Sequence, residues 1–229
     1  MNTTLEWTDE DAQRVADIAA RVPGYSGDLH YKWWRILLHQ VAPESLLMLG
    51  CYHGRDIAFL LDILHQYHPE HRMRIVGVDK FSNDDCLDWA PQQKGKTWQE
   101  AGFGEPPSFE AATRNISAMP GSEMVELVQS RDEDYLARCS ETFRVSYLDT
   151  DHTGPTVYRQ LKQCRRVLSP NGILCGDDYA NAGTWGVIDA VRNSFHLHQV
   201  FEGYVWNSPV AQLKTDALID YYANGGKPR

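Results

Sequence analysis

The feature that most constrains the fold is a strand–glycine–helix pattern between Leu46 and Leu61. Residues 46–49 are apolar and of strand length, and they meet Gly50 before a short turn that reaches Gly54. Apolar residues then recur at helical spacing, at Ile57, Leu60, Leu61 and Leu64. Glycine permits a bound molecule to approach such a turn closely, because no Cβ obstructs it. The pattern predicts an α/β fold with a binding site at the carboxyl edge of a sheet, although a tight connection explains it equally well.

Composition narrows the class of protein. A chain of 229 residues with 42% hydrophobic content can bury the core of a single α/β domain. Its net charge of −9 argues against nucleic acid as a partner. No apolar run has the length of a membrane span, and the polar, acidic residues 1–11 resemble neither a signal peptide nor an anchor. We therefore expect no membrane partner.

Cysteine usage indicates the compartment. The five cysteines are odd in number and lack Cys-x-x-Cys spacing, and most lie among apolar residues. Buried free thiols in a reducing cytoplasm are therefore expected.

Two helices are expected ahead of the first strand, over residues 9–22 and 31–41. They make up an N-terminal segment, residues 1–42, that either covers a cofactor cleft or packs on the edge of the sheet.

A second strand, residues 73–79, ends in Asp79. In a dinucleotide-type sheet, a carboxylate in this place accepts hydrogen bonds from ribose hydroxyls. A lone Asp at a strand end is often a helix cap, but its pairing with the Gly50 turn favours ribose binding.

Residues 82–108 interrupt the alternation of strands and helices. A loop of this length is usually functional or mobile, and Trp89, Trp98 and Phe103 give it aromatic surface. We interpret it as a lid or substrate wall, with a surface insertion of no catalytic role as the alternative.

A helix over 109–119 and a strand over 124–129 follow. Ser130 and Asp132 come next, in reach of the far end of a nucleoside, although Asp132 is also a good helix N-cap.

Acidic side chains follow the next two strands. Residues 143–148 lead into Asp149-Thr150-Asp151-His152, and residues 173–176, after a helix over 155–168, lead into Asp177-Asp178. The tips of neighbouring parallel strands lie roughly 5 Å apart. Four carboxylates gathered there would repel one another and raise their own pKa values. A hard cation such as Mg²⁺ or Ca²⁺ removes that conflict, and the alternative is a set of helix caps and solvated acids.

Together these segments resemble the class I S-adenosylmethionine-dependent methyltransferases. The resemblance covers roughly residues 30–205 and rests on Leu-Gly-Cys-Tyr-His-Gly, Val-Gly-Val-Asp79 and the two acidic strand tips. It is greatest to bacterial small-molecule O-methyltransferases of the catechol and macrocin type. It implies a Rossmann-like three-layer sandwich with a seven-stranded, mostly parallel sheet whose last strand is antiparallel. It also implies O-methylation of a small molecule in specialised metabolism.

The resemblance further implies where the ligands bind. S-adenosyl-L-methionine is expected to contact residues around the first glycine turn and at the following strand tips: Gly50, Cys51, Tyr52, Gly54, Asp79, Ser130, Asp132 and Asp149. Mg²⁺ is expected on Asp149, Asp177 and Asp178. Asp151 matches the base of the sugar enzymes, and His152 stands where catechol enzymes carry a lysine. We favour Asp151 as the base, with His152 as the competitor.

One departure from the family is Met48, which occupies a position that often holds an acid two residues before the first glycine. Cofactor binding is therefore expected to depend more on Asp79 and the backbone, or to be weaker.

Beyond the metal strands we predict a helix over 184–195, a hairpin of 198–207 with 210–214, and a tail after Thr215. The tail is predicted to be frayed or to form a homodimer or higher homo-oligomer contact.

Three hypotheses about function remain open. The first is a Mg²⁺-dependent O-methyltransferase for a catechol-like or sugar diol hydroxyl. The second is a metal-independent methyltransferase on the same fold, in which the acids serve as base and caps. The third is a binding protein that kept the fold without methylating anything.

Overall fold

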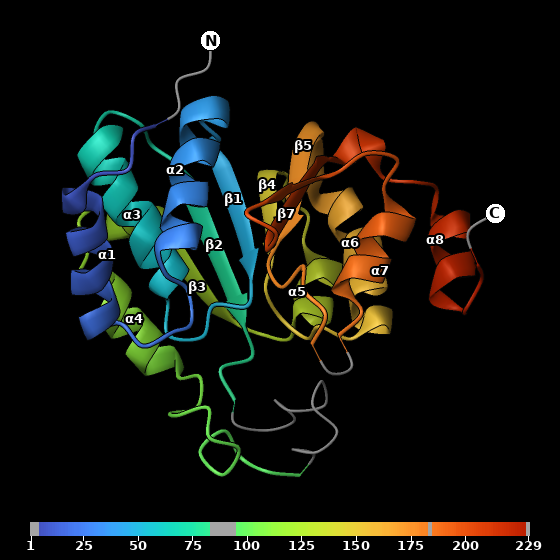
Figure 1. Ribbon diagram of the computed structural model, residues 1–229, viewed down its shortest axis with the longest axis horizontal. Coiled ribbons are helices and arrows are strands. Elements are labelled where there is room, and N and C mark those ends of the chain that lie inside the picture. Colours follow the sequence, from blue (N-terminus) through green and yellow to red (C-terminus); the bar gives the residue numbers. More distant parts are fainter. Residues whose placement is uncertain (1–4, 83–94, 183–184, 228–229) are drawn as a thin grey trace.

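A single sheet forms the centre of the computed structural model, which describes residues 5–82, 95–182 and 185–227 (Figure 1). Within these residues the sheet has seven strands in the order β3-β2-β1-β4-β5-β7-β6. They are β1 (Ser45–Leu49), β2 (Arg74–Asp79), β3 (Val125–Gln129), β4 (Phe143–Leu148), β5 (Leu168–Gly176), β6 (Gln199–Phe201) and β7 (Val205–Pro209). β1 to β5 pair in parallel, and β7 runs antiparallel to both of its neighbours. The predicted fold class is confirmed.

Helices cover both faces of the sheet (Figure 1). One layer holds α1 (Asp9–Arg21), α2 (Asp28–Val41), α3 (Arg55–Tyr67) and α4 (Phe109–Ser117). The other holds α5 (Asp132–Arg138), α6 (Gly154–Val167), α7 (Val187–Ser194) and α8 (Asp216–Ala223). None of the helices in the described ranges is long and apolar enough to cross a membrane.

Strand β1 shows why the apolar pattern produces this sandwich. Leu46 and Met48 pack into the core beneath α1 to α4, whereas Leu47 and Leu49 pack into the core beneath α5 to α8. Successive side chains of a strand point to opposite faces. A strand covered by helices on both faces must therefore be apolar at every position, as this run of leucine and methionine is.

The register aligns the carboxyl ends of the strands. Leu49 of β1 pairs with Val78 of β2 and with Leu148 of β4, and Leu148 pairs with Gly176 of β5. The residues that follow these strands therefore meet at one edge. The strand order reverses between β1 and β4, and open α/β sheets bind ligands at such a switch point.

Several predicted boundaries in the C-terminal part are wrong. The predicted strand over 198–207 is divided into β6 and β7 by a tight turn in which Glu202 and Gly203 both have positive φ. Residues 210–212 form a short 3₁₀ helix instead of a strand. Strand β5 starts at Leu168 and not at residue 173, and α7 starts at Val187 and not at residue 184.

The tail is not frayed where the structure describes it. It contains α8, whose Ile219 side chain is fully buried against the α6 and α7 layer. Lys162 and Arg165 of α6 also form ion pairs with Asp220 and Asp216 of α8. The prediction of an oligomer contact there stays a prediction.

Candidate functional site

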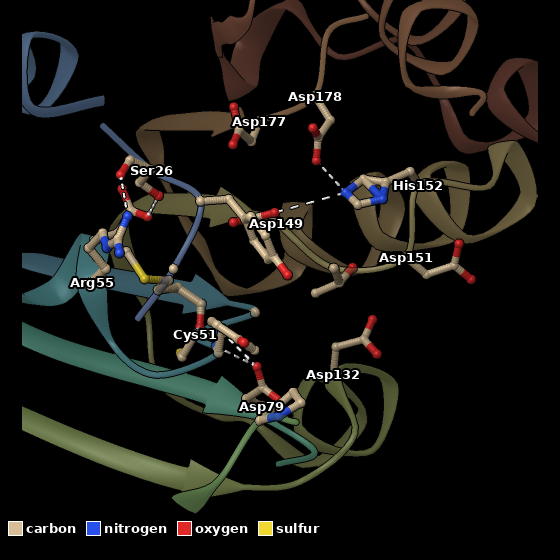
Figure 2. A pocket seen from close by; sticks show the side chains of 18 of the residues that line it. Ser26, Cys51, Arg55, Asp79, Asp132, Asp149, Asp151, His152, Asp177 and Asp178 are labelled. Atoms are coloured by element: carbon tan, nitrogen blue, oxygen red, sulfur yellow. Dashed lines mark hydrogen bonds and ion pairs between the residues drawn. The ribbon is translucent and has the colours of Figure 1, made fainter. Parts of the chain in front are cut away.

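A cavity of about 870 Å³ opens at the carboxyl edge of the sheet. Most of the predicted site residues line it: Gly50, Cys51, Tyr52, Asp79, Asp132, Asp149, Asp151, His152, Asp177 and Asp178 (Figure 2). Gly54 and Ser130 do not line it. Gly54 begins α3 with a φ of +88°, and the Ser130 hydroxyl contacts Arg131 and Arg138. The strand tips therefore meet at one cavity, as the order of motifs predicted.

The Gly50 turn is organised around protein contacts. A Cβ on Gly50 would lie 1.6 Å from the carbonyl oxygen of Asp149, and its φ is +87°. Gly50 thus allows the chain after β1 to lie against the chain after β4, and because Gly50 also lines the cavity, the expectation that it lets a ligand approach closely stays a prediction. Gly54 differs, because a Cβ there would meet only the movable end of the Ile116 side chain at 2.9 Å, and its φ of +88° is what favours glycine.

Asp79 is held in place by the same turn. Its Oδ2 accepts the backbone N–H groups of Cys51 and Tyr52, at 2.8 and 2.9 Å. Its Oδ1 accepts the N–H of Phe81 at 2.8 Å. Each carboxylate oxygen has two lone pairs, so Oδ2 is filled by its two donors and Oδ1 keeps capacity for one further donor. A fixed carboxylate with this capacity at the tip of β2 suits a ribose hydroxyl.

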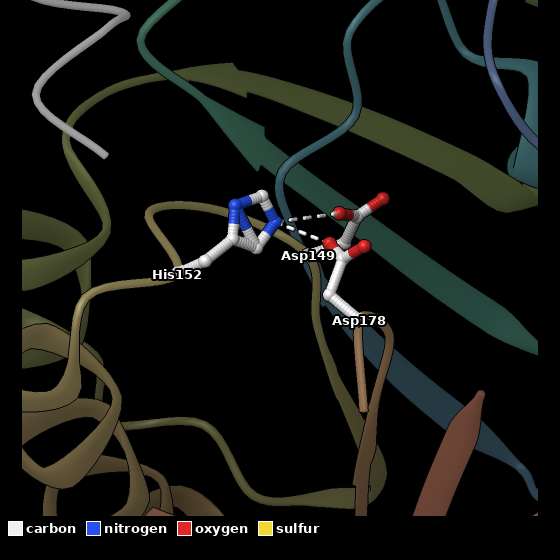
Figure 3. Close-up of side chains that lie close together, drawn as sticks. All are labelled: Asp149, His152 and Asp178. Carbon is white, nitrogen blue, oxygen red and sulfur yellow. Dashed lines mark ion pairs between the residues drawn. The ribbon is translucent and has the colours of Figure 1, made fainter. Parts of the chain in front are cut away.

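Acidic side chains gather where β4 and β5 end (Figures 2 and 3). Single ligand atoms of Asp149, His152 and Asp178 lie within 4.8 Å of one another. Nε2 of His152 contacts a carboxylate oxygen of Asp178 and lies 3.9 Å from Asp149. Asp178 has a φ of +60°, a left-handed conformation that is uncommon outside glycine and concentrates at functional sites. The backbone is thus strained where it turns this carboxylate into the cluster.

The carboxylates change one another's titration. Desolvation, followed by repulsion from Asp177 and Asp178, raises the pKa of Asp149 well above its usual value. Burial raises the pKa of Asp177 to about 6, although its contact with His30 acts in the other direction. Burial lowers the pKa of His152 against the opposing effect of Asp178. The cluster carries more negative charge than its surroundings neutralise, which favours a bound cation.

Asp177 has a partner that the sequence did not indicate. Its Oδ2 lies 2.9 Å from Nε2 of the buried His30 in α2. Nδ1 of His30 accepts the N–H of Gly27, so Nε2 is the nitrogen that donates to Asp177. Oδ1 of Asp177 is buried without a hydrogen-bond partner in the described part of the chain. An unsatisfied buried oxygen of this kind calls for a further ligand.

Asp151 differs from the other acids. Its Oδ1 accepts the N–H of Thr153 at 2.7 Å, and its Oδ2 accepts the hydroxyl of Thr156 at 3.0 Å. Figure 2 shows its carboxylate turned away from Asp149 and Asp178. The side chain lines the cavity and also satisfies backbone at the start of α6, which is the work of a helix cap.

A family model described as a methyltransferase domain matches residues 47–179. The chain belongs to this methyltransferase family. The match starts in β1 and ends just after Asp178, so it contains the glycine turn, Asp79 and both acidic tips. It confirms the predicted resemblance at the level of the family. A search of curated proteins found no match.

Three solved structures share the fold of this methyltransferase. The O-methyltransferase NovP is 13% identical, with a TM-score of 0.64 over 88% of this chain and 96% of that chain. The O-methyltransferase of Bacillus cereus in complex with SAH is 16% identical, with a TM-score of 0.55 over 90% and 93%. TomG of Streptomyces achromogenes, an O-methyltransferase involved in tomaymycin synthesis and solved with SAM, is 16% identical, with a TM-score of 0.53 over 90% and 91%.

Aromatic side chains form one wall of the methyltransferase cavity. Tyr52 stacks on Tyr25 with ring centroids 5.7 Å apart and on Trp98 with centroids 5.4 Å apart. The Tyr25 hydroxyl donates to the carbonyl of Phe103, so the loop before α2 is joined to the insertion. Trp98 and Phe103 line the cavity, in agreement with a substrate wall. Trp89 lies outside the described residues.

Several cavity residues were missed by the sequence reasoning, and three of them are charged or polar side chains that act on the site. Asp56 in the first turn of α3, His30 in α2 and Tyr204 before β7 all line the cavity. Tyr204 donates its hydroxyl to Oδ1 of Asp178 at 2.6 Å. Only Asp56 had a sequence signal, since an acid directly after the glycine turn is adjacent to the predicted ligand.

Proposed function

We propose that this methyltransferase transfers the methyl group of S-adenosyl-L-methionine to a hydroxyl of a small molecule that carries a vicinal diol, either catechol-like or a sugar. We further propose that a divalent cation takes part and that the reaction belongs to specialised metabolism. The observation that carries the proposal is the cluster of Asp149, His152 and Asp178 in the same cavity as Asp79 and the Gly50 turn.

The cavity fits the methyl donor. Its volume of about 870 Å³ lies in the range of sites for cofactor-sized ligands. The ribose would be held by Asp79, and the base would lie toward Asp132 and Arg131 on the same wall. S-adenosylmethionine supplies a methyl group that is already activated, so the chain's main task is to align an oxygen with it. The SAM and SAH complexes of the two similar enzymes support this choice of donor.

The acidic tips fit a divalent cation. Asp149 and Asp178 each offer a carboxylate oxygen, the ligand type that Mg²⁺ prefers, and the unsatisfied Oδ1 of Asp177 belongs to the same cavity, although the cluster of close ligand atoms contains His152 and not Asp177. If His152 were a ligand in place of Asp177, the mixed set would suit a softer metal better. A bound cation lowers the pKa of substrate hydroxyls that coordinate it.

His152 suits the role of base better than Asp151. Its ring lies beside both acids, and the lowered pKa keeps the imidazole neutral and able to take a proton. Trp185 stacks on this ring with centroids 4.5 Å apart and fixes its orientation. Asp151 is committed to Thr153 and Thr156. We therefore assign proton removal to His152 and positioning of α6 to Asp151.

The test is a transfer assay with isotopically labelled S-adenosylmethionine and a panel of catechols and sugar diols. The protein is first treated with chelator and then assayed with and without added Mg²⁺. We expect labelled product only with the metal restored. Undiminished turnover in chelator would contradict the metal role and favour a metal-independent methyltransferase. Absence of S-adenosylmethionine binding would contradict the proposed function as a whole.

A further inference from the structure

We infer that Asp56 binds the α-ammonium group of S-adenosylmethionine, which the apolar Met48 at the end of β1 cannot do. The inference rests on the proposed function, because it assigns a role toward the proposed methyl donor. The carboxylate that binds the ammonium group would then lie in the first turn of α3 and not at the end of β1.

The local structure holds Asp56 at the cavity. Gly54 is the N-cap of α3, so Asp56 is the second residue of the helix, where the helix dipole favours a negative charge. Oδ1 accepts the indole N–H of Trp34 at 2.8 Å, and Oδ2 accepts the hydroxyl of Ser26. Both donors come from the N-terminal segment, which thereby fixes the orientation of a carboxylate that lines the cavity.

Among the described residues Asp56 forms no ion pair, although its charge acts at longer range on His30 and Arg55. Asp56 is only 8% exposed, and no lysine or arginine within the described ranges pairs with it within 4.0 Å. The neighbouring Arg55 directs its guanidinium to the carbonyl oxygens of Val22, Ser26 and Ala19 instead. A buried carboxylate without a counter-charge is costly, so a cationic ligand would stabilise it.

The carboxylate also keeps room for a ligand. Each oxygen accepts one hydrogen bond in the structure, which leaves a further lone pair on each. The ammonium of an amino acid presents three donors. By contrast, the side chain of Met48 is 1% exposed and apolar where it lines the same cavity, and it cannot bind a cation by charge.

The position of Asp56 agrees with the expected course of the donor. Asp56 lines the cavity together with Asp79, the proposed ribose site, and with Asp149 of the acidic cluster. Its charge acts on that cluster, because it contributes to the raised pKa of Asp149 and of Asp177. Within this set, Asp56 is the acid that neither the proposed metal nor the ribose uses.

The test compares two ligands on Asp56→Asn by calorimetric titration. Asparagine has the same shape, and it can accept from Trp34 and donate to Ser26, so the fold is expected to persist. S-adenosylmethionine is expected to bind on the order of 10- to 100-fold more weakly, the loss typical of a charge-assisted hydrogen bond. Methylthioadenosine, which lacks the amino-acid part, is expected to bind as it does to the wild type.

Asp62→Asn is the matched control. Asp62 lies on the same helix and accepts a hydrogen bond from Tyr31 at 2.7 Å, but it does not line the cavity. Its substitution is expected to leave the binding of both ligands unchanged.

Two results would overturn only this inference: wild-type affinity of Asp56→Asn for S-adenosylmethionine, or an equal loss for both ligands, which would mean that Asp56 only positions the loop. If the wild type binds neither ligand, the result would contradict both this inference and the proposed function.

Discussion

His152 and Asp151 lie side by side in the sequence, and the structure gives them different surroundings. Replacing His152 with alanine removes the proposed base but leaves the Gly50 turn and Asp79 in place. We expect kcat to fall by about 10²- to 10⁴-fold, the usual contribution of a general base. The dissociation constant of S-adenosylmethionine should stay within about twofold of wild type. Steady-state kinetics together with calorimetry measure the two effects separately.

Asp151→Asn provides the comparison. Because its oxygens accept from Thr153 and Thr156, this change is expected to cost about 1 kcal/mol of unfolding free energy through a weakened cap. The effect on kcat should be small. A loss of kcat in Asp151→Asn greater than that in His152→Ala would reverse the assignment and restore Asp151 as the base.

Gly50→Ala tests the contact between the tips of β1 and β4. A methyl group would overlap the Asp149 carbonyl, so we expect a loss of about 3 kcal/mol or more in unfolding free energy. Gly27→Ala is the control, because a Cβ there has no atom within 4 Å. Urea unfolding of both variants provides the measurement, and equal stabilities would show that the tips do not approach as described.

Some site residues could be predicted from the sequence and others could not. Asp79 ends a strand, Asp149, Asp177 and Asp178 follow strands, and parallel strands bring their ends to one edge. His30 could not be predicted, because its contact with Asp177 spans 147 positions in the chain and depends on how α2 packs. The sequence also did not show that Gly50 lies against the Asp149 carbonyl, because that contact joins two segments far apart in the chain.

At the scale of elements, Asp11 joins three helices. It is fully buried in α1, and it accepts from Arg35 of α2 at 2.6 Å and from Tyr67 of α3. Asp11→Asn would leave the Arg35 guanidinium buried beside a neutral group. We expect a loss of about 3 kcal/mol in the free energy of unfolding, measured with urea. Wild-type stability in this variant would show that the ion pair does not hold the N-terminal helices.

The same residue predicts a dependence on pH. Burial alone would raise the pKa of Asp11, but hydrogen bonds from Tyr67 and Thr8, together with the charge of Arg35, lower it overall. A lowered pKa gives stability that is present above the usual carboxyl value of about 4 and is lost as the pH falls below it. Wild-type unfolding free energy should therefore fall more steeply than that of Asp11→Asn between about pH 4 and about pH 2. Parallel pH profiles for the two proteins would contradict this.

Helix α8 is expected to contribute to the core. Ile219→Ala should cost about 2 to 5 kcal/mol, because it removes a fully buried side chain and leaves a cavity. Leu197→Ala, at a side chain that is 62% exposed, should change stability by less than about 0.5 kcal/mol. Thermal unfolding compares the two variants, and an equal, small effect would mean that the tail is only loosely attached.

The elements themselves were predictable where burial leaves a simple pattern. Strand β4 has the predicted bounds, and β1, β2 and β3 differ by one residue each. The clearest pattern is that of β1, which is covered on both faces and apolar from Leu46 to Leu49. The C-terminal hairpin was placed wrongly, since its turn has a left-handed Glu202 that carries no special signal. Helix α8 was missed because its single buried residue, Ile219, gives too little periodicity.

At the scale of the molecule, the fold followed from the alternation of strands and helices, and the family match agrees with it. The acceptor does not follow in the same way. Its binding would depend on the aromatic wall of Tyr25, Tyr52 and Trp98, which joins the N-terminal segment to the insertion through tertiary contacts. Such contacts have no pattern in the sequence.

The most direct test of the account is a calorimetric titration of S-adenosylmethionine into the purified protein, with Mg²⁺ and again with chelator. We predict saturable binding to one site per chain in both conditions, because Asp79, the Gly50 turn and Asp56 are separate from the metal ligands. Absence of binding in either condition, in protein that unfolds cooperatively, would contradict the central claim that this cavity holds the methyl donor.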